Sequence, residues 1–264
     1  MRQDRGPVAL KGFVALFIVF MLAPIVVVVV VSFSAQGFVS FPVRAFSLRW
    51  YHRIVEYRPF LDSLIVSLQL ALVSTLAAAV IAVPAALVIG RRRGAVADAI
   101  AGFILSPISM PLIVLGYALL FYLSWLGLGI SFLGLAIAHT VVGVPYMFRT
   151  VLGVYRSQPR DYEEAAAILG ANQLQTFAFV TLPLIRPGIF AGALFAILIS
   201  LDNLPISYFF GSPATNTLPV VMLSYLEHQF DPSIAAIGTV QMVLAMTALA
   251  VVDRIYGLRR LNVT

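Results

Sequence analysis

Six long apolar stretches dominate this chain of 264 residues, and they leave few folds open to it. A helix needs about 20 consecutive apolar residues to cross the hydrocarbon core of a bilayer. Backbone groups in lipid must be paired within the protein, so these stretches are expected to be helices. The alternating pattern of β-barrel strands is absent. The six predicted spans cover approximately residues 10–33, 62–90, 97–123, 133–153, 187–208 and 233–256.

The composition also indicates an integral membrane protein. Hydrophobic residues make up 61% of the chain and charged residues 11%, whereas soluble domains carry about 25% charged residues. The chain has no cysteine, which excludes disulfides and thiol chemistry. The first apolar run, from Val8 to Val31, is longer than the core of a cleaved signal peptide, which spans about 7–15 residues. We therefore predict an all-α membrane protein of six transmembrane helices that forms a single domain over residues 1–264.

The placement of Lys and Arg predicts the orientation. If the N-terminus is cytoplasmic, thirteen of the 17 basic residues lie in the cytoplasm and four lie outside it, as the positive-inside rule requires. Both termini and the loop at about 154–186 are then cytoplasmic. The net charge of +6 is explained by topology, and no nucleic-acid partner is predicted. The cytoplasmic set is Arg2, Arg5, Lys11, Arg91, Arg92, Arg93, Arg149, Arg156, Arg160, Arg186, Arg254, Arg259 and Arg260, and the other set is Arg44, Arg49, Arg53 and Arg58.

A polar island follows the fourth span and predicts a short helix. Pro159 suits the first turn of a helix. Asp161, Glu163 and Glu164 then place negative charge near the positive end of the helix dipole. Three alanines continue the helix, because alanine has the highest helix propensity. Gly170 can end it in a left-handed conformation.

A second short helix is predicted directly afterwards. Asn172 can cap it, with Gln175 three residues further on as the reciprocal partner. Pro183 and Pro187 are expected to break the chain before the fifth span begins. The loop as a whole should therefore form a helix, a sharp turn and a second helix.

The loop resembles the EAA signature of the permease subunits of bacterial ABC importers. Glu164-Ala165-Ala166, then Gly170, then Val180-Thr181-Leu182-Pro183 match that signature in residue type and spacing, with Val180 where the family usually has Ile. The resemblance implies a type I importer permease fold, in which this loop transmits the ATP-driven closure of an ATPase to the membrane helices. The alternative is an amphipathic hairpin that only packs on the spans. The resemblance assigns coupling to Glu163, Glu164, Ala165, Ala166, Gly170, Leu182 and Pro183.

The chain contains no phosphate-binding loop of the G-x-x-x-x-G-K-[ST] type, and its single lysine, Lys11, lies in no such motif. It also shows no metal-ligand spacing, and its three histidines are widely separated. We predict that it is not an enzyme and holds no cofactor or metal. ATP and magnesium would be bound by a partner ATPase.

Polar residues near the end of the fifth span are candidates for the substrate path. An ionised Asp202 at membrane depth needs a partner, water or a cationic substrate, and intramembrane charges are functional by default. The alternative is a structural Asp at the outer end of the helix. Asn203, Ser200 and Tyr146 are added as path candidates. For the remaining polar positions in the spans we favour ordinary helix–helix hydrogen bonding. These are Gln69, Ser74, Thr75, His139 and Gln241.

The stretch from Ser200 to Gln241 resembles the second permease subunit of the spermidine/putrescine branch. The residues that carry this resemblance are Leu201-Asp202-Asn203, Phe210-Gly211-Ser212, Thr217-Leu218-Pro219 and the run from Asp231 to Ala236. It implies a small cationic, polyamine-like solute, although the position of Asn203 is often acidic in that branch. A zwitterionic amine is the alternative solute. An ion-coupled secondary transporter is a less favoured alternative, because neither inverted repeats nor several buried charges are visible. A membrane scaffold without a transport path is a further alternative, in which Asp202 would be dispensable.

The family resemblance also implies a set of partners. These are a second permease subunit, expected to be a distinct homologue, two ATPase subunits, and an extracytoplasmic binding protein, all at a bacterial inner membrane. The binding protein would dock near residues 34–61 and 209–232, where short surface helices are expected. Trp50 and Tyr51 suit the membrane interface. Pro107 and Pro111 should kink or break the third span.

Overall fold

The computed structural model describes residues 6–256, and Arg2, Arg5, Arg259 and Arg260 of the predicted cytoplasmic set lie outside this range. Within it, five continuous helical segments are long and apolar enough to cross a membrane, and a bent pair supplies a sixth crossing if counted as one span. This agrees with the six predicted spans. The five segments are α1 (Gly6–Ser32), α3 (Arg58–Gly90), α6 (Phe132–Ser157), the run Gln173–Leu201, and α12 (Ser233–Tyr256).

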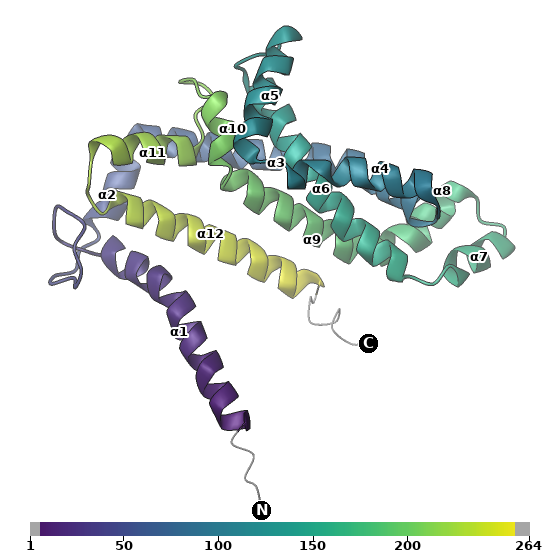
Figure 1. Cartoon of the computed structure of the whole chain (residues 1–264), viewed down its shortest axis with the longest axis horizontal. Coiled ribbons are helices and arrows are strands. Elements are labelled where there is room, and N and C mark those ends of the chain that lie inside the picture. Colours follow the sequence, from purple (N-terminus) through teal and green to yellow (C-terminus); the bar gives the residue numbers. More distant parts are fainter. Residues whose placement is uncertain (1–5, 257–264) are drawn as a thin grey trace, which may run out of the picture. The chain divides into compact units, whose positions relative to one another are not determined.

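The third predicted span is broken, as its prolines indicate. It consists of α4 (Ala95–Leu105), a 3-10 turn η1 (Ser106–Ser109) and α5 (Leu112–Trp125), and the two helices are bent by 106°. Pro107 lies at the start of η1 and Pro111 precedes the first residue of α5. A proline lacks the N–H that would continue the preceding helix, so the two prolines confine the bend to this joint. Figure 1 shows α5 running in a different direction from α4.

The predicted break before the fifth span is wrong. α8 (Gln173–Thr176), a π-helical turn η2 (Phe177–Thr181) and α9 (Leu182–Leu201) form one uninterrupted helical run. Leu182 donates its N–H to the Phe177 carbonyl, five residues back, so the hydrogen-bond register shifts just before Pro183. This shift places Pro183 in the first turn of α9, where a missing N–H costs little. Pro187 lies inside α9, and membrane helices tolerate such prolines.

The contacts divide the chain into two units, which are described separately; the predicted single domain stays a prediction. The larger unit, Asp62–Val221 with the residues from Ala245, is built around α6 and α9, which lie side by side (Figure 1). A Cβ at Gly192 would stand 3.0 Å from the Cα of Met147, and one at Gly188 would stand 3.0 Å from the Val154 side chain. Small residues at these positions therefore let the two helices approach closely.

Two buried apolar clusters complete this unit. One joins α3, α4, α6 and α9 around Phe148 and Ile185, both fully buried. The other joins α3, α5 and α6 to α10 (Leu204–Phe209) around Leu135 and Phe210. Together they fix the ends of α3, α6 and α9, from which the loop and the polar residues of interest project.

The smaller unit comprises the residues up to Leu61 and Met222–Leu244. It contains α1, α2 (Arg49–Glu56) and most of α11 (Leu218–His228), so both segments expected to carry short helices contain one. From Leu10 to Val26 the side chains of α1 are exposed, which suits a helix surrounded by lipid. The ring of Trp50 packs inside the unit and is not exposed as a membrane anchor would be. It is 5% exposed and its Nε1 donates to the Ser34 carbonyl at 2.7 Å, so Trp50 anchors α2 within the unit.

Candidate functional site

The loop at 154–186 forms the predicted helix–turn–helix. α7 spans Asp161–Ile168, and Gly170 ends it with a φ of +84°, the left-handed region expected of this glycine. Asn172 and Gln175 form a capping box at the start of α8. Each side-chain oxygen accepts from the other residue's backbone N–H at 2.9 Å. The turn is therefore held by local interactions on both sides.

Glu163 on α7 accepts three hydrogen bonds through its carboxylate. Arg91, directly after α3, forms an ion pair in which Nε lies 3.2 Å from Oε2. The hydroxyls of Tyr155 on α6 and Thr181 in η2 donate to Oε1 at 3.0 and 2.9 Å. Arg91 also donates to the Gln158 carbonyl and covers the Tyr155 ring, 4.2 Å from its centre. We call Glu163, Arg91, Tyr155 and Thr181 the Glu163 junction, because one carboxylate joins α7 to α3, α6 and η2.

The turn between α7 and α8 presents apolar side chains to its surroundings. Ile168, Leu169 and Leu174 are between 75% and 88% exposed, and we call them the loop patch. Exposed apolar groups gathered on one element commonly mark an interaction surface. The coupling residues predicted from the sequence lie around this patch in different environments. Glu164, Ala165, Gly170 and Pro183 are exposed, Leu182 is half-buried, Ala166 is buried, and Glu163 belongs to the junction.

A second polar group lies inside the larger unit, where α9 gives way to α10. His139 on α6 is 2% exposed and bonds through both ring nitrogens. Nδ1 lies 2.8 Å from the Ser200 hydroxyl near the end of α9, and Nε2 lies 3.1 Å from the Ser207 hydroxyl on α10. Ser74 on α3 donates to Ser200 at 3.5 Å. We call these four residues the His139 cluster. Its hydrogen bonds connect both α9 and α10 to α6.

The predicted path residues do not form one group. Ser200 belongs to the His139 cluster, Tyr146 is half-buried on α6, and Asp202 is exposed at the end of α9. Asn203 is buried and caps α10, its Oδ1 accepting from the Ile206 N–H at 3.2 Å. Since that bond fixes the amide, Nδ2 is the group left buried without a partner among the described residues. A buried donor of this kind is an expected contact for water or a solute.

The family model of the binding-protein-dependent transport system inner membrane component matches residues 82–260, which is more than half of the chain. The chain belongs to this family. The matched range contains the loop, the Glu163 junction and every member of the His139 cluster except Ser74. It is a multi-pass membrane protein and a permease subunit of the ABC importer kind, and the family resemblance inferred from the loop is confirmed.

Relatives of this permease carry different substrate names. It is 32% identical to the putrescine transport system permease PotI of Escherichia coli (strain K12), over 83% of this chain and 80% of that protein. It is equally 32% identical to the molybdenum transport system permease ModB of Mycobacterium tuberculosis (strain ATCC 25618 / H37Rv), over 81% of this chain and 87% of that protein. Its fold matches a permease chain of a bacterial ABC transporter that imports alginate, with a TM-score of 0.73, 18% identity, and coverage of 97% and 98% of the two chains.

Sequence reasoning about the permease missed the groups that hold the two sites together. The sequence marks Arg91 only as a basic residue of the predicted cytoplasmic set, although it is the ion-pair partner of Glu163. Thr181 lies within the matched signature, which was the available hint of its role in the junction. His139 was assigned ordinary helix–helix bonding, and its two hydrogen bonds between helices agree with that interpretation. No spacing along the chain pointed to Ser207.

Proposed function

We propose that this permease forms half of a translocation path and that its helix–turn–helix couples the path to ATP hydrolysis in a separate subunit. The observation that supports this most is the combination of the exposed loop patch with the Glu163 junction directly behind it. The patch offers a partner an apolar surface on a short helix. The junction ties that helix to the ends of two membrane-spanning helices, so a displacement of α7 is passed to α3 and α6.

The assembly we propose follows the family. A second permease subunit, a distinct homologue, supplies the other half of the path, and two ATPase subunits bind ATP and magnesium. An extracytoplasmic binding protein delivers the solute. Both termini lie in the cytoplasm at a bacterial inner membrane, as the distribution of basic residues indicates. Nucleotide-driven closure and reopening of the ATPase pair then bias the path between outward-open and inward-open states.

For the solute we propose a small cationic, polyamine-like molecule. Similarity to the putrescine permease PotI supports this, and so does the exposed carboxylate of Asp202 at the end of α9. One observation favours a second candidate, a zwitterionic amine. The unpartnered Nδ2 of Asn203 is a donor and pairs with an oxygen acceptor, which a polyamine lacks and a carboxylate supplies.

The coupling role is tested by ATP hydrolysis and uptake in proteoliposomes that contain the complete transporter. Glu164→Ala and a Leu169→Glu substitution in the loop patch are compared with Ile130→Glu, an exposed apolar residue between α5 and α6 that lies outside the segments expected to meet the binding protein. We expect both loop variants to lose substrate-stimulated hydrolysis and uptake while the Ile130 variant retains them. If the loop variants hydrolyse ATP and transport as well as wild type, the coupling role is wrong.

The solute is tested separately, with putrescine, spermidine, 4-aminobutyrate and molybdate as alternative substrates in the wild-type transporter. Uptake of the two polyamines supports the first candidate, and uptake of 4-aminobutyrate alone supports the second. Asn203→Asp adds the acidic group that is common in the polyamine branch. It should shift preference toward putrescine, whereas Asp202→Asn should shift preference away from it. Uptake of molybdate alone would contradict both candidates.

A further inference from the structure

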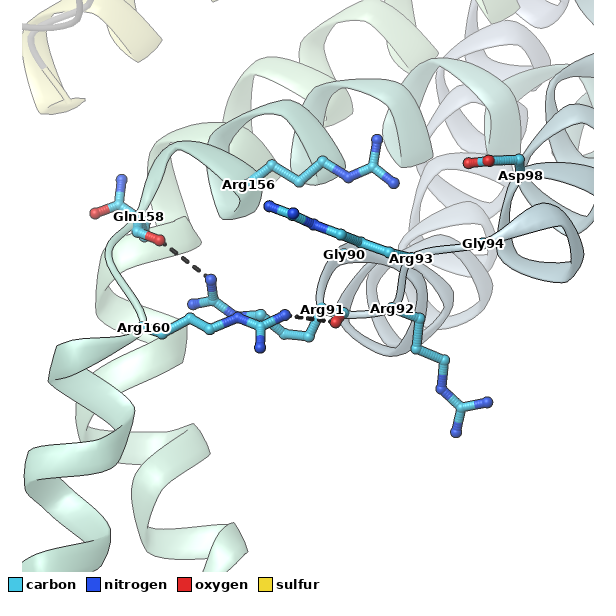
Figure 2. A pocket seen from close by; sticks show the side chains of 9 residues that line it. All are labelled: Gly90, Arg91, Arg92, Arg93, Gly94, Asp98, Arg156, Gln158 and Arg160. Atoms are coloured by element: carbon cyan, nitrogen blue, oxygen red, sulfur yellow. Dashed lines mark hydrogen bonds between the residues drawn. The ribbon is translucent and has the colours of Figure 1, made fainter.

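A strongly basic pocket of about 530 Å³ opens where α3 ends and α4 begins (Figure 2). Its lining includes five arginines and a single carboxylate, that of Asp98. Like charges gathered around one concavity repel each other, and an anion between them relieves that repulsion. The five arginines are Arg91, Arg92, Arg93, Arg156 and Arg160.

Part of this pocket is rigidly built. Arg91 donates to the Gln158 carbonyl at 3.1 Å, and Arg160 donates to the Arg91 carbonyl, so two guanidinium groups are held by backbone oxygens. Gly90 gives the wall its shape, since a Cβ there would lie 2.5 Å from the Tyr155 ring. Gly94 turns the chain with a φ of +117°, a conformation that glycine adopts without strain. The walls therefore exist before any ligand arrives.

The side chains of the other arginines in the pocket have no partner among the described residues. Those of Arg92, Arg93 and Arg156 form no hydrogen bond or ion pair with the described part of the chain, whose one ion pair is that of Arg91 with Glu163. Figure 2 shows the Arg92 side chain pointing away from those of Arg93 and Arg156. The pair Arg93 and Arg156 thus offers donors that nothing in the protein satisfies. Gly94 has no side chain that could cap the first N–H groups of α4.

The surroundings of the pocket place it at the surface of the bilayer. Val88 on α3 and Val96 on α4 are exposed apolar residues that flank the arginine run on either side. The change from exposed apolar to basic side chains within three residues marks the boundary between hydrocarbon and headgroups. Phosphate groups of lipids are the anions present at that depth. Basic pockets between membrane helices on the cytoplasmic side commonly bind such headgroups.

We propose that this pocket binds the phosphate of an anionic phospholipid, with Arg93 and Arg156 as its main ligands. The pocket lies outside the substrate path and the loop patch. The chemistry it recognises is a phosphate anion, which a lipid headgroup or free inorganic phosphate could supply. We assign it to the lipid because the pocket adjoins exposed apolar surface on both sides.

The test is native mass spectrometry of the complete transporter released from detergent, with added phosphatidylglycerol or phosphatidylethanolamine. We expect wild type to retain phosphatidylglycerol in preference to phosphatidylethanolamine. The double variant Arg93→Gln/Arg156→Gln should bind phosphatidylglycerol about 25-fold more weakly, because each basic residue near a membrane surface contributes roughly a factor of five. The matched control is Arg186→Gln/Arg254→Gln, which removes two exposed arginines outside the pocket and should bind as wild type does.

A further variant, Asp98→Asn, distinguishes loss of the binding site from misfolding. Asp98→Asn removes the only carboxylate lining the pocket and should strengthen phosphatidylglycerol binding about fivefold by the same reasoning. A misfolded protein would not show such a gain. Equal loss in both double variants would overturn the proposal, since the effect would then be one of general charge. No preference between the two lipids would overturn it as well.

Inorganic phosphate distinguishes the two sources of the anion. Displacement of phosphatidylglycerol by millimolar phosphate, absent in the Arg93→Gln/Arg156→Gln variant, supports a shared phosphate site that the lipid occupies. Binding of phosphate without any binding of phosphatidylglycerol overturns the lipid assignment. Loss of the ATPase subunit from the double variant with lipid retention unchanged would also overturn it, because the arginines would then face the partner protein.

Discussion

The Glu163 junction and the His139 cluster both hold several helices together, but the chemistry of their contacts differs. Each uses one side chain to join three or more helical elements of the permease. The junction contains an ion pair whose side chains are about one fifth exposed, whereas the cluster contains no ion pair among the described residues and its histidine is 2% exposed. A partly exposed ion pair is weakened by salt and can open and close, while a buried hydrogen-bonded network without an ion pair is little affected by salt and costly to break. We infer that the helices joined at the Glu163 junction can shift relative to one another, whereas the His139 cluster keeps its helices in place.

The largest expected effect comes from Glu163→Ala, which removes all three hydrogen bonds to the carboxylate. We expect α7 to lose about 3 kcal/mol of local stability, because charge-assisted hydrogen bonds contribute about 1.5–3 kcal/mol each and exposure reduces them here. Hydrogen exchange of residues 161–168 should accelerate about 100-fold. Glu163→Gln keeps two acceptor bonds and should show a smaller change. Unchanged exchange in the Ala variant would mean that the junction does not hold α7.

The next effect is expected for His139→Leu, which leaves the hydroxyls of Ser200 and Ser207 without their shared partner. The loss should be about 2 kcal/mol, since leaving a buried polar group without a hydrogen-bond partner costs about 1–3 kcal/mol. Thermal unfolding in detergent measures it, with Ser207→Ala as the milder control. The comparison of the two sites predicts that 0.5 M salt loosens α7 and leaves this Tm difference unchanged. A strong salt dependence of the His139 effect would contradict the distinction.

A smaller effect is expected at Gly170, whose φ of +84° is unfavourable for residues with a Cβ. Gly170→Val should destabilise the turn by about 1–2 kcal/mol, the cost of the left-handed conformation for an L-residue. Gly170→Asn should be milder, because asparagine adopts this conformation more readily. No other atom lies within 4 Å of a Cβ there, so steric conflict does not contribute. Equal uptake by the two variants would show that turn geometry does not matter for transport.

The smallest effect is expected from Asn172→Ala, which removes one half of the capping box. The cost should be about 1 kcal/mol of local stability, typical of a lost N-cap. Faster exchange should be confined to residues 173–176. Asn172→Ser keeps a capping oxygen and serves as the control. An effect that spread to α9 would mean that α8 and α9 unfold together.

Local signals in the sequence predicted much of this structure. The capping box of Asn172 and Gln175, the left-handed Gly170 and the break at Pro107 and Pro111 all act within a few residues, so spacing along the chain reveals them. The predicted helix break at Pro183 is wrong because a π-helical turn shifts the hydrogen-bond register just before that proline. No residue preference in the sequence indicates such a turn.

Contacts between distant segments could not be predicted. Arg91 and Glu163 are 72 positions apart, and His139 and Ser207 are 68 apart, so their pairing depends on how the helices pack. Packing also decided the environment of Trp50, whose residue type alone suits a membrane interface. The sequence therefore predicted the position of the candidate loop, whereas its contacts with Arg91, Tyr155 and Thr181 are visible only in the folded structure.

The most direct test of the central claim is site-directed cross-linking at the loop patch of the assembled transporter. The chain has no cysteine, so a single Leu169→Cys substitution carries a photoreactive maleimide at one position only. Phe230→Cys, also highly exposed, is the control in the other unit. The account predicts that the ATPase subunit is captured from position 169, with a yield that changes when ATP is added, and is not captured from position 230. Equal capture from both positions, or none from position 169, would contradict it.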